Sequence, residues 1–161
     1  MKIAITDANI FIDLIYLELI DEMFGIEVEI HTTVNVVDEL NTKQQHVLQK
    51  FTKKAVLTIH SQEGLNVPKG IKSNRSLSDS DKSVFGLAIQ LDAFILTGDR
   101  VIRQVSGFQK IEVHGILWLF DQFLEKKLIS KKNAVQHLKA LMAYNKRLPT
   151  TECEQRIHDW K

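Results

Sequence analysis

Short apolar runs alternate along the chain with longer segments in which apolar residues recur every three or four positions. The short runs have the length and the β-branched content of buried strands. The longer segments have the period of helices that pack through one face. Strands are therefore predicted at residues 2–6, 27–31, 56–60, 93–97 and 111–114. Helices are predicted at residues 9–24, from a cap at 32 or 33 to about 53, at 78–91, shortly after 99, and at 116–127, 130–145 and 152–160.

Strand and helix take turns along the sequence, which is typical of an α/β protein. Such an order predicts a central, mostly parallel sheet that is covered by helices on both faces. Residues 61–77 hold Gly, Pro, Asn, Ser and Lys without periodicity and are predicted to form a loop. No internal repeat or linker divides the chain. The prediction is a single domain over residues 1–161, in which about 130–161 form a helical C-terminal extension.

Bulk composition narrows the function only slightly. The chain has 161 residues, 44% hydrophobic and 25% charged, and its net charge of +1 gives no sign of a nucleic-acid partner. The charge is uneven, because residues 126–147 are rich in Lys and contain no acid. Such a run is most often the solvated face of a helix, and a contact surface for phosphate is the alternative.

The N-terminus and the single cysteine bear on location. Cys153 has no partner for an intrachain disulfide, which fits the reducing cytoplasm. The first strand begins at once, without a signal-peptide pattern. No apolar run reaches membrane-spanning length, so no membrane partner is expected. The expected location is the cytoplasm.

Four acidic residues stand where predicted strands end or a helix begins. Asp7 follows the first strand, Glu39 comes after the second, Asp81 lies in the first turn of the helix at 78–91, and Asp99 follows the fourth strand. The carboxyl ends of parallel strands form the edge of an α/β sheet where ligands bind. Carboxylates that converge there repel one another unless a cation lies between them, and hard oxygen ligands favour Mg²⁺ or Mn²⁺. The pattern predicts a metal-dependent phosphoryl-transfer site.

Each acid also has a purely structural interpretation. Asp7 and Asp99 are good N-caps for the helices that follow them. Asp81 resembles the partner of a capping box that begins at Ser78. Glu39 could pair with Lys43 one turn later. For Asp7 and Asp99 the pairing matters more than either residue, because a reversal of strand order would bring both to one crevice.

The acids also occur within short motifs, in the order of a known family. The motifs are Thr6-Asp7-Ala8-Asn9-Ile10-Phe11-Ile12-Asp13, Val36-Val37-Asp38-Glu39-Leu40, Ser78-Asp79-Ser80-Asp81 followed by Gly86-Leu87-Ala88, and Leu96-Thr97-Gly98-Asp99-Arg100. In these motifs, which cover roughly the first three-quarters of the chain, the sequence resembles the PIN-domain nucleases. The resemblance implies a three-layer α/β/α sandwich with a parallel sheet.

The resemblance also implies roles for particular residues. It implies that Asp7, Glu39, Asp81 and Asp99 form the catalytic cluster that binds Mg²⁺ or Mn²⁺. Supporting polar positions are implied at Asn9 and Thr97, and Asp79 is implied as an acid behind the ligands. Each of these roles is implied only for a residue that lies within a matching motif.

Later segments add a biological expectation. Residues 96–103, Gly115-Ile116-Leu117 and Leu128-Ile129 look like a branch near the VapC-type toxins. That likeness implies single-stranded RNA as substrate, a small antitoxin protein as partner, and a homodimer. Leu138, Leu141 and Met142 on the C-terminal helices could serve either a dimer or the core.

Nucleic acid needs cations beside an acidic pocket. Arg100 and Arg103 flank Asp99, and Lys69, Lys72 and Arg75 precede Asp81; all are candidates for positioning the phosphate backbone. His31 and His60 end the second and third predicted strands and could reach substrate. Surface ion pairs and structural histidines are the alternatives.

Three other function classes compete with the nuclease. A haloacid dehalogenase-like phosphohydrolase needs a second Asp two residues after the first, where this chain has Asn9. A receiver domain needs a phosphorylatable Asp after the third strand, and that strand ends at His60. A PIN fold without activity could be an RNA-binding or protein-interaction module. The sequence favours a metal-dependent endoribonuclease.

Overall fold

Five short strands and nine helices make up the part of the chain that the computed structural model describes, residues 1–61 and 77–161. The strands are β1 (Ile3–Thr6), β2 (Glu29–Thr33), β3 (Leu57–His60), β4 (Phe94–Leu96) and β5 (Val113–His114). The helices are α1 (Ala8–Tyr16), α2 (Ile20–Met23), α3 (Val34–Asp38), α4 (Thr42–Lys53), α5 (Asp79–Leu91), α6 (Arg100–Phe108), α7 (Ile116–Glu125), α8 (Lys131–Tyr144) and α9 (Thr150–Trp160).

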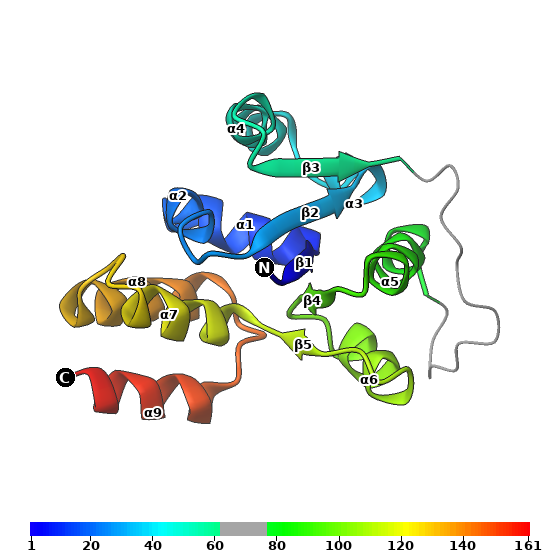
Figure 1. The fold of residues 1–161 in the computed structure, drawn as a ribbon. Helices are drawn as coiled ribbons and strands as arrows, with labels where there is room; N and C mark the ends of the chain where they lie inside the picture. The colour runs from blue at the N-terminus through cyan, green and yellow to red at the C-terminus, as the bar shows by residue number, and fades with distance from the viewer. Residues whose placement is uncertain (62–76) are drawn as a thin grey trace.

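The strands form one all-parallel sheet in the order β3-β2-β1-β4-β5. Right-handed crossovers from β1 through α1 to β2, and on to β3, carry their helices to one face. The chain then crosses back through α5 to β4 and through α6 to β5, which carries those helices to the other face. Figure 1 shows α5 and α6 together on one side, and α1, α2 and α7 on the other. The predicted three-layer α/β/α sandwich is confirmed.

The direction of chain travel reverses at β1. Its Ile5 pairs with His31 of β2 on one side and with Ile95 of β4 on the other, so sequence-distant strands are neighbours. A reversal of this kind leaves a crevice beyond the carboxyl ends of the two central strands. This brings the residues after β1 and β4 side by side.

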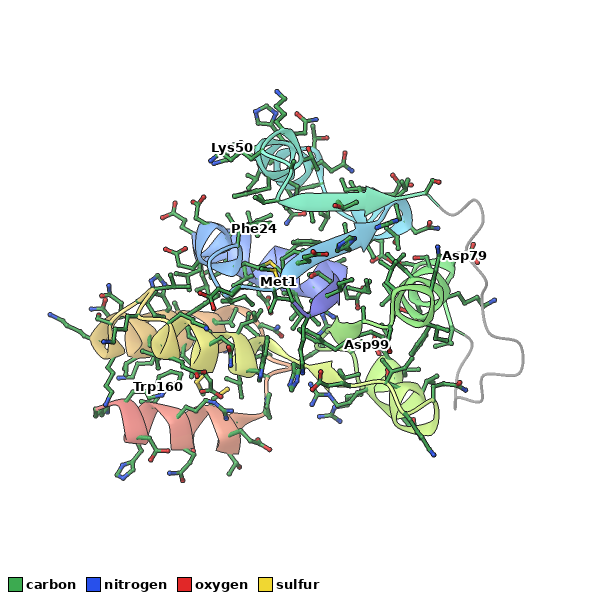
Figure 2. All side chains as sticks on the ribbon, in the orientation of Figure 1. Met1, Phe24, Lys50, Asp79, Asp99 and Trp160 are labelled. Atoms are coloured by element: carbon green, nitrogen blue, oxygen red, sulfur yellow. The ribbon has the colours of Figure 1, made fainter. Side chains whose placement is uncertain are left out.

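Fully buried phenylalanines fill the space between the layers. Phe11 and Phe85 lie on helices of opposite faces, and Phe120 and Phe123 extend the core beneath the C-terminal helices. Leu138 and Leu141 of α8 are also fully buried and belong to this core. Helix α9 is held by Trp160, whose ring centroid lies 5.9 Å from that of Phe120, and by Arg156, which donates to Asp121 of α7 at 2.8 Å. Figure 2 shows α9 beneath α7, with Trp160 near its end.

The single helix predicted at 9–24 is wrong. Helix α1 ends at Tyr16, and α2 begins only at Ile20. Between them Glu18 has a positive φ of 58°, a left-handed conformation that cannot continue a right-handed helix. Leu14, Leu17 and Met23 are nevertheless all buried, so the apolar spacing that suggested one helix is also compatible with two helices and a turn.

The continuous helix predicted from residue 33 to about 53 is also two helices. Thr33 caps α3 by accepting from the Val36 amide at 3.2 Å, but α3 ends at Asp38. Asn41 then starts α4 with a capping box, in which its side chain and that of Gln44 each accept from the other's backbone N–H. The break places Glu39 between two helices. It also removes the helical register that would have paired Glu39 with Lys43.

The remaining predicted boundaries hold within a few residues. Strand β2 starts two residues later than predicted, after Glu27, whose φ of 64° interrupts an extended chain. The predicted loop at 61–77 falls almost wholly outside the described residues. Within residues 1–61 and 77–161, no helix combines the length and apolarity needed to cross a bilayer.

Candidate functional site

Asp7 and Asp99 lie at the carboxyl ends of the two central strands. The backbone N–H of Asp7 donates to the Leu96 carbonyl at 2.9 Å, which extends the β1–β4 pairing by one residue. The Asp7 carboxylate accepts from the Ala8 amide at 2.9 Å and begins α1. The Asp99 carboxylate accepts from the Val101 amide at 2.7 Å and begins α6. Asp7 and Asp99 are therefore N-caps of α1 and α6, and these hydrogen bonds hold both carboxylates at the crevice.

One hydroxyl joins these two acids. Thr97 Oγ1 donates to Asp7 Oδ2 at 2.8 Å and accepts from the Asp99 backbone N–H at 3.0 Å. Thr97 is fully buried, so its side chain has little freedom to leave this bridge. Asn9 supports the same turn, because its Oδ1 accepts from the Gly98 amide at 3.0 Å. Asn9 and Thr97, the two residues predicted as supporting positions, thus form hydrogen bonds between the two segments that carry Asp7 and Asp99.

Glu39 and Asp81 reach the crevice from other elements. Glu39 is the C-cap residue of α3, and no ion pair joins it to Lys43 in the structure. Asp81 lies in the first turn of α5, where its Oδ2 accepts from the Ser78 amide at 3.1 Å and its own amide donates to Ser78 Oγ at 3.0 Å. This is the anticipated capping box, and it fixes the direction of the Asp81 side chain.

All four predicted acids line one cavity of about 370 Å³. We call it the acidic cavity and define it by Asp7, Glu39, Asp81 and Asp99. Asn9, Ile12, Ser78 and Arg147 also contribute to its wall. The sequence separation among the four acids spans most of the described chain, so only the folded sheet brings them together.

The electrostatics of the acidic cavity are those of crowded carboxylates. Burial, together with the charges of Asp81 and Glu39, raises the pKa of Asp7 to about 6 against the hydrogen bonds from Thr97 and Ala8, which lower it. Burial likewise raises the pKa of Glu39, with added repulsion from Asp81 and Asp99. Like charges that raise one another's pKa favour the uptake of a proton or a cation.

The donor set fits a hard divalent ion. Four carboxylates offer only oxygen ligands, which suit Mg²⁺ and Mn²⁺. Among the described residues, no three Asp, Glu, His or Cys side chains lie close enough to form a finished ligand cage. Mg²⁺ is commonly held by one or two carboxylates and keeps several of its waters, so an open site of this kind remains compatible with it.

A family model for the PIN domain matches residues 3–161. The chain belongs to the PIN-domain family. PIN domains are generally nucleases, hydrolases that typically use divalent metal ions, and the acidic cavity lies where such a site is expected in the fold. No curated protein matches the chain.

The other predicted site residues lie elsewhere in this PIN domain. Asp79 is exposed at the start of α5 and does not line the acidic cavity; Figure 2 shows it apart from Asp99. Arg100 and Arg103 line a second, adjoining cavity. Lys69, Lys72 and Arg75 are outside the described residues.

The two histidines at the strand ends contact each other. His31 Nδ1 and His60 Nε2 are 2.8 Å apart, and neither side chain lines the acidic cavity. Burial, together with the charge of His31, lowers the pKa of His60. The structure therefore gives this pair a structural contact between β2 and β3.

Arg147 was not among the predicted site residues. It follows α8 in the connection to α9, and of the described residues that line the acidic cavity it is the one with a cationic side chain. The sequence carries a weak signal for it, because Arg147 ends the basic stretch that begins at Lys126. Nothing local distinguishes it from neighbouring Lys146, and only the packing of α8 brings it to the acids.

Proposed function

We propose that this PIN domain is a divalent-metal-dependent endoribonuclease that hydrolyses phosphodiester bonds in single-stranded RNA. The observation that carries the proposal is the convergence of Asp7, Glu39, Asp81 and Asp99 on one cavity at the switch point of the sheet. The raised pKa of Asp7, about 6, supports a cation-binding role for this group. The specificity for RNA is supported by the family resemblance, and the arginines beside the cavity support binding of a phosphate backbone.

The roles of the residues follow from their positions. Asp7 and Asp99, held together by Thr97, are the direct metal ligands, and Asp81 and Glu39 bind a further ion or orient the attacking water. A bound Mg²⁺ or Mn²⁺ supplies an acidified water and neutralises charge on the phosphate. Arg147 offers the compensating positive charge that brings a phosphodiester close to four carboxylates. Asn9 holds the Gly98 turn and has no proton to give as a general acid.

We further propose that the protein is the toxin of a toxin–antitoxin pair and forms a homodimer. The likeness of the later segments to VapC-type toxins is the support for both. Co-purification of a small partner protein and light scattering of the purified chain address these two points separately from activity.

Asp7→Asn is expected to abolish metal-dependent cleavage of labelled single-stranded RNA and to leave the protein folded. The amide can still accept one hydrogen bond and cap α1, but it has lost the charge that binds a cation. Glu39→Gln is expected to lower the rate as well, because it removes a second charge from the same cavity. The assay compares Mn²⁺, Mg²⁺ and EDTA on a mixed set of RNA oligomers.

Asp38→Asn is the matched control. Asp38 is exposed, directly precedes Glu39 and does not line the acidic cavity, so its loss should leave the rate unchanged. Cleavage by Asp7→Asn at the parent rate would show that the site is wrongly assigned. A well-folded parent that cuts no RNA with either metal would favour the binding module instead.

A further inference from the structure

A second cavity, of about 480 Å³, adjoins the acidic cavity and shares Asn9 and Arg147 with it. We call it the arginine pocket and define it by Arg100, Arg103, Arg147, Arg156, His114 and Trp118. Its wall combines the start of α6, the β5–α7 junction and the α8–α9 connection. Its volume falls within the range of small-molecule sites, about 300–1,000 Å³.

The arginines of this pocket differ in whether they form ion pairs. Arg156 donates to Asp121 through two of its nitrogens, so this pair is neutralised within the wall. Arg100, Arg103 and Arg147 are exposed, and no ion pair holds any of them among the described residues. The wall also contains two further acids, Asp13 and Glu152. Asp13 is buried and accepts from Asn145 Nδ2 at 3.1 Å.

The guanidinium of Arg103 occupies space that a side chain at Gly115 would fill. A Cβ atom at Gly115 would lie 3.0 Å from Arg103 Nη2, so the absence of a side chain at Gly115 makes room for this end of the arginine. Gly115 has an ordinary extended φ of −112°, which means that space rather than backbone conformation is what the glycine provides here. The end of Arg103 therefore lies close to the β5–α7 junction, on the wall of the pocket.

Two aromatic rings form another part of the wall. His114 and Trp118 stack with ring centroids 4.4 Å apart and an interplanar angle of 15°. Phe94 meets both rings edge-on, with centroids 5.5 Å away in each case, and fixes their orientation. Partly exposed aromatic rings, beside guanidinium groups that have no ion pair among the described residues, suit a nucleotide, since bases stack on such rings and phosphates bind arginine.

We propose that the arginine pocket binds one nucleotide of the RNA strand, next to the phosphodiester held in the acidic cavity. Its phosphate contacts Arg103 and Arg147, and its base lies against the His114–Trp118 wall. Arg147 lines both cavities, so in this proposal it contacts both parts of the strand. This assignment rests on the proposed ribonuclease function for its substrate, but it concerns binding and needs no cleavage.

Tryptophan fluorescence tests the proposal directly. The chain has two tryptophans, so Trp160→Phe leaves Trp118 as the only indole. A uridine pentanucleotide is titrated in EDTA, where no divalent ion supports cleavage. We expect saturable quenching of Trp118 by the pentanucleotide, and no quenching by an abasic pentamer or by inorganic phosphate alone.

Arginine variants in this background give the sharper readout. Arg103→Gln and Arg147→Gln should each weaken pentanucleotide binding by about tenfold or more, the effect of losing a charge-assisted hydrogen bond. Lys146→Gln is the matched control, because Lys146 is exposed beside Arg147 and lines neither cavity. Gly115→Ala provides a second probe, since its methyl group displaces only the flexible end of Arg103.

The proposal would be overturned if both arginine variants bound with the parent's affinity, or if Lys146→Gln lost as much affinity as they do. It would also be overturned if no oligonucleotide quenched Trp118. The two hypotheses fail in different ways. Cleavage that depends on Asp7 together with arginine-independent binding would leave the nuclease standing and reject the pocket. Binding that depends on Arg103 without any cleavage would do the reverse.

Discussion

At the residue scale, hydrogen bonds stabilise the buried polar side chains near the crevice, and burial of their charge opposes this. Thr97 satisfies Asp7 and Asp99 at once with one hydroxyl. Asp13, one turn beyond Asn9 on α1, is 5% exposed, and its main partner is Asn145. Burial raises the pKa of Asp13 to about 6, although Asn145 and the charge of Arg147 partly offset it. Ionised Asp13 is therefore a cost to the folded state.

Asp13→Asn is expected to gain stability relative to the parent as the pH rises from about 4 to about 7. The folded-state pKa of Asp13 is above its unfolded value, so the folded parent binds the extra proton, and its stability falls as pH rises through this window. The full effect is at most about 3 kcal/mol. Urea unfolding at several pH values measures the difference, with exposed Asp38→Asn as the control. A difference that is flat with pH would contradict the burial of a titrating Asp13.

At the scale of elements, the backbone conformation at a helix end decides where the helix stops. Helix α4 ends in a Schellman motif, in which the Val56 amide donates to the Phe51 carbonyl at 3.0 Å and the Ala55 amide donates to the Thr52 carbonyl at 3.0 Å. Ala55 occupies the position that glycine usually takes, with a φ of 59°. A Cβ atom in this conformation costs roughly 1–2 kcal/mol.

Ala55→Gly is expected to raise the free energy of unfolding by about 0.5–1 kcal/mol, because relief of the left-handed strain exceeds the added entropy of the unfolded chain. Ala140→Gly is the matched control. Ala140 is exposed in the interior of α8, where the same substitution should destabilise by about 1 kcal/mol. Chemical denaturation distinguishes the two. Effects of the same sign would refute the assigned conformation at Ala55.

At the scale of the whole molecule, the sheet gathers negative charge from four elements into one cavity. Mg²⁺ or Mn²⁺ should therefore raise Tm, because an ion that binds only the folded state stabilises it. At ten times its Kd the ion contributes about 1.4 kcal/mol, and each kcal/mol raises Tm by about 2–4 °C in a chain of this size. Calorimetry in Mg²⁺, Mn²⁺ and EDTA measures the shift.

Asp7→Asn and Glu39→Gln should lose most of the metal-induced shift, and Asp38→Asn should keep it. The same rise in Asp7→Asn as in the parent would place the ion elsewhere. This readout does not depend on finding the right RNA, so it tests the metal site even where cleavage is not observed.

Local pattern was sufficient for much of the architecture. Apolar periodicity predicted the sheet, the flanking helices and the strand ends at which Asp7 and Asp99 stand, because side-chain burial repeats with the period of the element. Ser78 was recognisable as a cap, and the second cap was narrowed to residue 32 or 33, of which Thr33 is the one observed, since a cap uses neighbours three residues away. The same dependence on local pattern misled the helix predictions, because buried residues at 14, 17 and 23 fit one continuous helix and two helices joined by a turn equally well.

The sequence by itself determined the alternation of strands and helices and the element ends at which the four acids stand, because those depend on residues close together in the chain. Only the tertiary structure decided that Arg147 joins the acids, that Arg103 rests over Gly115, and that His31 contacts His60. Asp13 and Asn145 meet across 132 positions, for the same reason. Such contacts depend on how packed layers place distant segments, and no spacing along the chain encodes them.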